Sequence, residues 1–210
     1  SGYGLTTGAE LKMLRVIQQI KQRSPIPVKA TFLGAHTYPL EYKNDHAGYI
    51  NLIRKEMLPN IAKEKLADYI DVFCEEGFFS VAEMNEIVEE GMKYGLKPKL
   101  HVNQLNSLGG VAAGIASHAV SLDHLEVMTG DDIQALANSN VIGTLLPTAA
   151  YFLRLPFQPA RKMIDAGCAV ALASDFNPGS SPSGNMNTVV SMSCIQMKML
   201  PEEAINAATV

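Results

Sequence analysis

Three histidines and one aspartate stand where predicted β-strands end. His36 follows ATFLGA, His101 follows KPKL, His124 follows VSLD, and Asp175 follows AVALAS. Neutral imidazole and carboxylate are common ligands of zinc and iron. A divalent ion held by such groups lowers the pKa of bound water to about 7, so hydroxide is present at neutral pH. A carboxylate nearby can act as general base, and the four residues together therefore predict metal-assisted hydrolysis.

Each of these residues alone is a weak signal, because a single histidine near a strand end is more often an ordinary core or surface residue. The other two histidines, His46 and His118, fall in loop or helical context and are interpreted as structural. Asp175 has an ordinary alternative as the N-cap of the next helix. That helix is predicted to begin several residues later, which favours the functional interpretation.

Short apolar runs alternate with amphipathic stretches along the whole chain. Strands are predicted over residues 28–33, 70–74, 97–102, 119–122, 141–145 and 169–173. Helical periodicity covers residues 7–22, 49–64, 81–94, 131–139 and 158–166. Repeated strand–helix units predict an α/β protein with a parallel sheet.

Polar residues follow nearly every predicted strand, with Glu75, Glu76 and Thr148 in addition to the four above. A (β/α)8 TIM-type barrel gathers all its strand ends on one face, whereas an open sheet uses mainly those near one switch point. No glycine-rich nucleotide-binding loop follows the early strands. The barrel is therefore favoured. About six βα units are present, so we expect residues 1–210 to form a single catalytic barrel domain that is incomplete.

Composition limits the partners and the compartment. Apolar residues make up 47% of the 210 residues, charged residues 18%, and the net charge is −4; these values favour a globular protein with neither a nucleic-acid nor a membrane partner. Cys74, Cys168 and Cys194 are widely spaced, which favours free thiols in a reducing, cytoplasmic setting. The chain starts with Ser1 in a loop-like stretch, so we expect it to be a segment of a longer protein.

Five motifs resemble those of imidazolonepropionase, a cyclic amidohydrolase of histidine degradation. They are SGYG, FLGAHTYPLEY, HVNQLNSLGG, SLDHLE and SDFNPGSSPS, and the resemblance runs from Ser1 into the last helix. It implies a metal-dependent amidohydrolase barrel with a small β-sandwich built from both termini; the first strands and the sandwich are not in these residues. It also implies that water opens the small-molecule substrate 4-imidazolone-5-propanoate to N-formimidoyl-L-glutamate.

The resemblance implies catalytic roles for three of the strand-end residues. His101 and Asp175 correspond to ligands of one divalent metal ion, zinc or iron. His124 corresponds to the histidine that polarises the scissile carbonyl, and Asp175 would also move the proton to the departing ring nitrogen. Asp123 and Glu126 flank His124. They could orient its ring, but we expect them to be solvated loop charges.

The substrate contacts implied by the resemblance come from two parts of the chain. They are Tyr3, His36, Asn177, Gly179 and Ser180, the last three forming the turn that receives the propionate group. The amide, backbone and hydroxyl donors of Asn-Pro-Gly-Ser suit a carboxylate. The same residue types also favour an ordinary turn.

Two departures from the family pattern stand out. Gln104 occupies a position, three residues after His101, that is usually a substrate-contacting glutamate; glutamine can hydrogen-bond the ring but cannot act as a base. The family's His-x-His metal ligands and a substrate-binding arginine are not found in these residues. We therefore expect the isolated 210-residue chain to be inactive.

Two other functions remain open at this point. One is another amidohydrolase, such as a heterocycle deaminase, although a bare base has no propionate for the Asn177 turn to hold. The other is a non-catalytic binding or assembly module. A barrel that lacks strands exposes a sheet edge, and this edge would allow pairing with a second copy as a homodimer.

Overall fold

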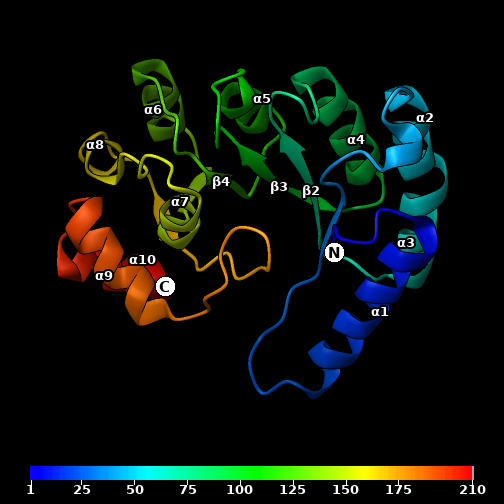
Figure 1. Ribbon diagram of the computed structural model, residues 1–210, viewed down its shortest axis with the longest axis horizontal. Helices are drawn as coiled ribbons and strands as arrows, with labels where there is room; N and C mark the ends of the chain where they lie inside the picture. Colours follow the sequence, from blue (N-terminus) through cyan, green and yellow to red (C-terminus); the bar gives the residue numbers. More distant parts are fainter. Residues whose placement is uncertain (210) are drawn as a thin grey trace. The chain divides into compact units, whose positions relative to one another are not determined.

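The computed structural model describes residues 1–209, and strands and helices alternate along them (Figure 1). The six strands follow sequence order in the sheet, β1 to β6, and β1–β2, β4–β5 and β5–β6 pair in parallel. The α/β class is thus confirmed. The strands are β1 (Thr31–Ala35), β2 (Tyr69–Cys74), β3 (Lys97–Val102), β4 (Ser121–His124), β5 (Ile142–Leu145) and β6 (Val170–Leu172).

All five helices predicted from periodicity are present, and the predicted helix 49–64 is divided into α2, a π-helical turn η2 and α3. Among the helices that periodicity did not predict, α5 and α7 lack a polar face in sequence, since they read GVAAGIA and PTAAYFL. The helices are α1 (Thr7–Arg23), η1 (Leu40–Tyr42), α2 (His46–Leu52), η2 (Ile53–Met57), α3 (Leu58–Glu64), α4 (Val81–Lys93), α5 (Gly110–Ala116), α6 (Gly130–Ala137), α7 (Pro147–Leu153), α8 (Ala160–Asp165), α9 (Met186–Gln196) and α10 (Pro201–Thr209).

Two strands are shifted toward the C-terminus relative to the sequence prediction. Strand β1 begins at Thr31 rather than at residue 28, because the Asp68 side chain accepts the Ala30 N–H at 2.8 Å, just before the first ladder pair. Strand β4 ends at His124 rather than at residue 122, because its last two residues pair with Thr144 and Leu145 of β5. Partners elsewhere in the chain set both boundaries.

The first compact unit comprises Ser1–His101 with Ser117–Ala119. Helix α4 packs on one face of β2 (Figure 1), where a Cβ on Gly91 would lie 2.4 Å from Ile70 Cδ1. Side chains alternate along a strand, so Asp71 and Phe73 point to the face opposite Ile70. The helices thus cover an apolar face of β2, and polar and aromatic side chains extend from the other.

The second compact unit comprises Val102–Ala116 and the chain from Val120 onward. Its core includes Leu122, Leu145, Met163 and Val189, all buried. Gly143 of β5 lies so close to Met163 that an added Cβ would be 3.0 Å from its terminal carbon. This close approach holds α8 against the β5 backbone.

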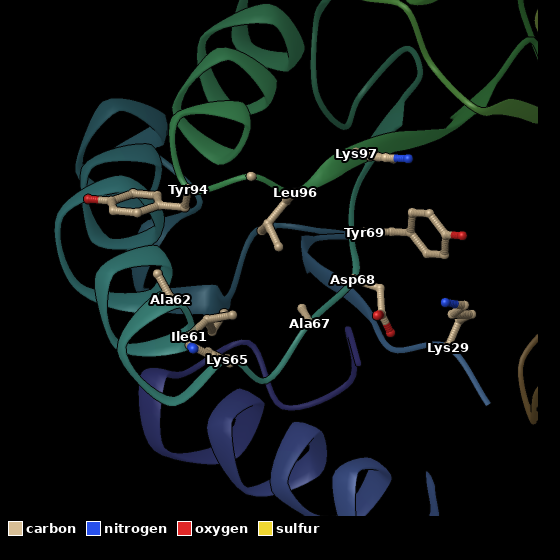
Figure 2. A pocket seen from close by; sticks show the side chains of 11 residues that line it. Lys29, Ile61, Ala62, Lys65, Ala67, Asp68, Tyr69, Tyr94, Leu96 and Lys97 are labelled. Carbon is tan, nitrogen blue, oxygen red and sulfur yellow. The ribbon is translucent and has the colours of Figure 1, made fainter. Parts of the chain in front are cut away.

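A cavity of about 320 Å³ lies within the first unit at the amino ends of β2 and β3, near Lys29, Asp68, Tyr69 and Lys97 (Figure 2). The residues Lys65 and Tyr94, which cap the C-termini of α3 and α4, also line it. Helix C-termini carry partial negative charge, so lysines here complement helix dipoles. The cavity is at the opposite end of these strands from the candidate site residues. No helix in residues 1–209 is long and apolar enough to cross a membrane.

Candidate metal and substrate-binding site

His101 is held by a buried carboxylate on the neighbouring strand. Its Nδ1 lies 2.8 Å from Asp71 Oδ2, and its backbone N–H donates to Asp71 Oδ1 at 3.2 Å. Asp71 is 4% exposed. A carboxylate this close to Nδ1 favours a proton on that nitrogen and leaves Nε2 as the atom able to bind a metal ion, as in carboxylate–histidine–metal arrangements. The arrangement therefore fits a histidine that ligates through Nε2.

His36 follows β1 and lies among aromatic rings in the same unit. Its Nδ1 lies 2.8 Å from the Gly2 carbonyl oxygen, so that nitrogen donates a hydrogen bond. The Tyr3 ring meets it edge-on at 5.5 Å between centroids, and the rings of Phe73 and His101 lie 6.1 and 6.4 Å away. The structure thus brings together Tyr3, His36 and His101, three of the residues singled out from the sequence.

The remaining candidate residues belong to the second unit. Gln104 is 8% exposed and lies in the loop after β3. The preceding Asn103 has a left-handed φ of 55°, and its side-chain amide donates to the Val127 carbonyl at 2.8 Å. A non-glycine residue in this conformation is often found at functional sites. The hydrogen bond from the Asn103 side chain to Val127 fixes the start of the loop that carries Gln104.

His124 is part of a buried polar chain, and the expectation of solvated charges around it is wrong. His124 Nδ1 lies 3.3 Å from Glu126 Oε1, and Gln158 Nε2 donates to the same oxygen at 2.9 Å. These three residues are between 1% and 5% exposed. Asp123 is also buried, and accepts the Ser121 hydroxyl at 2.7 Å. A charge buried in this way needs polar partners, so Glu126 orients the His124 ring.

Asp175 lies three residues beyond β6 and is not a helix cap. The next helix, α9, is capped by Asn185, whose side chain accepts backbone N–H groups of its first turn. Asp175 is half-buried and has a left-handed φ of 50°. The carbonyl of the preceding Ser174 accepts hydroxyls from Thr148 and Ser181, each at 2.7 Å. These bonds fix the backbone that presents the Asp175 carboxylate.

The Asn177–Ser180 turn is held by its own side chains. Asn177 Oδ1 accepts the Gly179 and Ser180 N–H groups at 2.9 and 2.8 Å. The Asn177 amide donates to the Asp175 carbonyl at 2.7 Å, and the Ser180 hydroxyl lies 3.4 Å from Asp175 Oδ2. The turn is thus linked to Asp175 at both backbone and side chain. A carboxylate that bound the two N–H groups would replace the Asn177 oxygen.

The two histidines interpreted as structural lie outside these clusters. His46 stacks on Tyr38 at 3.7 Å and contacts Glu83 at 3.2 Å. His118 is exposed in a turn with a φ of 54°. Asp71 and Gln158 also belong to these clusters but were not predicted from the sequence. Asp71 could have been recognised as the single charged residue inside the apolar strand YIDVFC. No feature of the sequence distinguishes Gln158.

Solved structures establish the class of fold. The chain superposes on guanine deaminase from C. acetobutylicum with a TM-score of 0.74 at 15% identity, covering 98% of this chain and 55% of that one. It superposes on N-isopropylammelide isopropylaminohydrolase from Burkholderia multivorans with a TM-score of 0.70 at 17% identity, covering 97% of this chain and 55% of that one. It superposes on an adenosine deaminase from Xanthomonas campestris with bound zinc with a TM-score of 0.61 at 16% identity. That alignment covers 90% of this chain and 45% of the deaminase. The chain therefore shares the α/β fold of the matching part of each of these proteins.

Proteins with similar sequences indicate a more specific relationship than the shared fold does. The chain is 59% identical to the imidazolonepropionase of Flavobacterium johnsoniae over 210 residues and 56% identical to that of Christiangramia forsetii. Each alignment covers all of this chain and 51% of the relative, so the chain spans about half the length of the curated relatives it matches. No family model matches. The resemblance to imidazolonepropionase is confirmed along the whole chain.

Proposed function

We propose that the protein containing this chain is a metal-dependent cyclic amidohydrolase that opens 4-imidazolone-5-propanoate with water to N-formimidoyl-L-glutamate. The observation that carries the proposal is the 59% identity to an imidazolonepropionase over all 210 residues. The fold neighbours support a hydrolase of carbon–nitrogen bonds. The chain would supply the later strands of one catalytic barrel domain.

The donor groups in this chain fit one divalent metal ion, zinc or iron. His101 would bind through Nε2, because its Nδ1 faces the Asp71 carboxylate at 2.8 Å. Asp175 would add a carboxylate oxygen, and further ligands would come from outside these residues. A divalent ion bound there would supply hydroxide at neutral pH, because it lowers the pKa of water to about 7.

The buried polar residues would serve the ring-opening step. As hydroxide adds to the ring carbonyl carbon, negative charge develops on the carbonyl oxygen, and His124 would stabilise it. Glu126 keeps the His124 ring in one orientation through the 3.3 Å contact. Asp175 would hold the proton that water releases on forming the hydroxide, and would deliver it to the ring nitrogen as the carbon–nitrogen bond breaks.

The substrate would be held at both ends. Tyr3 and His36 would contact the ring, and Gln104 would hydrogen-bond it without taking a proton. Asn177, Gly179 and Ser180 would receive the propionate carboxylate, whose charge their amide and hydroxyl donors can satisfy. The free cysteines in the structure support a reducing, cytoplasmic compartment for this reaction.

Turnover by the full-length protein tests the proposal. The purified protein is given 4-imidazolone-5-propanoate, and the products are followed by NMR and by an ammonia assay. We expect N-formimidoyl-L-glutamate without release of ammonia. A protein that instead releases ammonia from an amino-substituted heterocycle is a deaminase. A protein that does neither reaction is a binding module, and both of these results overturn the proposal.

A further inference from the structure

We propose that Glu10 is a positioning residue of the substrate site, which fixes Tyr3 and His36 through the backbone of the loop Ser1–Leu5. The inference rests on the proposed substrate contacts of those two side chains. Glu10 itself lies in the first turn of α1 and is fully buried. It plays no part in the proposed reaction steps, so its burial needs a separate explanation.

The Glu10 carboxylate binds backbone N–H groups of the loop. Oε2 accepts from Gly2 at 2.9 Å, and Oε1 accepts from Gly4 and Leu5, each at 3.0 Å. Burying a carboxylate is unfavourable unless hydrogen bonds compensate. Helix α1 already has an N-cap in Thr6, which accepts the Ala9 N–H. The carboxylate is thus not required to cap the helix, and its bonds order the loop instead.

The loop has a backbone conformation that few sequences would adopt unaided. Gly2 has a φ of 107° and Leu5 a φ of 56°. A Cβ on Gly2 would lie 2.8 Å from the Leu33 carbonyl oxygen, and one on Gly4 would lie 2.3 Å from Ala9 Cβ. Such conformations persist only where the surroundings fix them. The three bonds to Glu10 supply part of that constraint, and the Tyr49 hydroxyl adds to it by donating to the Leu5 carbonyl at 3.2 Å.

The ordered loop connects directly to the two substrate-binding candidates. The Gly2 carbonyl accepts the His36 Nδ1 proton at 2.8 Å, which puts the imidazole lone pair on Nε2. Tyr3 lies between two residues that Glu10 holds, and its ring packs edge-on against His36 at 5.5 Å. Tyr3 is 53% exposed, so we expect the backbone that Glu10 holds to contribute to the position of its ring.

The test uses Glu10→Gln in the full-length protein, with Glu83→Gln as the matched control. Glu83 also accepts a backbone N–H, from Ser80 at 2.7 Å, but in the capping box of α4. We expect Glu10→Gln to speed amide hydrogen exchange at residues 2, 4 and 5 by about tenfold or more. We also expect KM to rise by about tenfold with a smaller change in kcat, as for lost ground-state binding. Glu83→Gln should change neither the exchange rates at residues 2, 4 and 5 nor KM.

A double-mutant cycle separates positioning from general destabilisation. If Glu10 acts through Tyr3, Glu10→Gln should raise KM much less in a Tyr3→Ala background. Equal effects in the two backgrounds, or unchanged exchange at residues 2, 4 and 5, would overturn the proposal. Gly4→Ala displaces the loop without removing the carboxylate. It should reproduce the rise in KM if Glu10→Gln fails to fold, and an unchanged KM would count against the proposal.

Failure of the proposed function gives a different result. In that case the wild-type protein does not turn over the substrate. The positioning role of Glu10 is then tested by amide hydrogen exchange at residues 2, 4 and 5 and by the NMR signals of the His36 ring nitrogens. A shift of the His36 signals in Glu10→Gln, with faster loop exchange, supports positioning. Unchanged signals overturn it.

Discussion

If His101 binds a metal ion as proposed, its contact with Asp71 should strengthen that binding. Carboxylates that hold a ligating histidine typically change metal affinity by about 10- to 100-fold when removed. We expect Asp71→Asn to weaken zinc binding by the full-length protein to that extent, measured by competition with a chelator. Asp45→Asn, which alters only the N-cap of α2, is the control. Equal zinc affinities for Asp71→Asn and wild type would contradict the assignment.

Glu126 should matter for the reaction because it orients His124. We expect Glu126→Gln to lower kcat by about 10- to 100-fold with little change in KM, since a misoriented donor loses transition-state stabilisation. Steady-state kinetics of the full-length protein measure this effect. Asp131→Asn, on the exposed first turn of α6, should leave kcat unchanged. A Glu126 variant with wild-type kcat would mean that Glu126 has no such role.

Residue type and position at a strand end were enough to select His36, His101, His124 and Asp175 from the sequence. Both properties are local, so they can be read from a few neighbouring letters. Asp71 and Gln158 gain their importance from partners 30 or more residues away. The error about Glu126 has the same origin, because burial of a loop carboxylate depends on the elements packed over it.

At the scale of single elements, the approach of α4 to β2 depends on Gly91. An added methyl group there meets Ile70 at 2.4 Å. We expect Gly91→Ala to lower the free energy of unfolding by about 1–3 kcal/mol, as overpacking usually does, measured by urea denaturation. Gly8→Ala in α1 has open space around its Cβ, and the higher helix propensity of alanine should raise stability by up to about 1 kcal/mol. Equal effects of the two variants would contradict this packing.

The alternation of strands and helices was predictable because each element has its own period in the sequence. The residues at which the elements begin and end were harder to predict. The start of β1 is set by Asp68, and the end of β4 is set by pairing with β5. Helices α5 and α7 were missed because they consist of small or uniformly apolar residues. Their helical state therefore depends on tertiary packing rather than on a pattern.

At the scale of the whole molecule, the buried thiol of Cys74 makes stability depend on alkaline pH. Burial, together with the charges of Glu75 and Glu83, raises the pKa of Cys74 from 9.0 to about 11. A raised pKa in the folded state means that the stabilisation is complete below pH 9 and is lost as pH rises toward 11. Removing Cys74 should reduce the alkaline loss by about 2 kcal/mol. Urea denaturation of wild type and Cys74→Ala at pH 8 and pH 10.5 measures this, and equal losses would contradict it.

The chain should not act as an enzyme alone. It spans about half the length of its curated relatives and contains no His-x-His pair, the motif that the resemblance implies for two of the metal ligands. We expect no turnover of 4-imidazolone-5-propanoate by the 210-residue chain under conditions in which the full-length protein is active. Product formed by the chain alone would show that the present residues suffice.

We propose that His101 and Asp175 hold the catalytic metal ion of the full-length protein. Crystals of the full-length protein, soaked in zinc and measured on both sides of the zinc absorption edge, test it most directly. We expect an anomalous peak within about 2.2 Å of His101 Nε2 and an Asp175 carboxylate oxygen. A peak bound by other residues, with neither His101 nor Asp175 in contact, would contradict it.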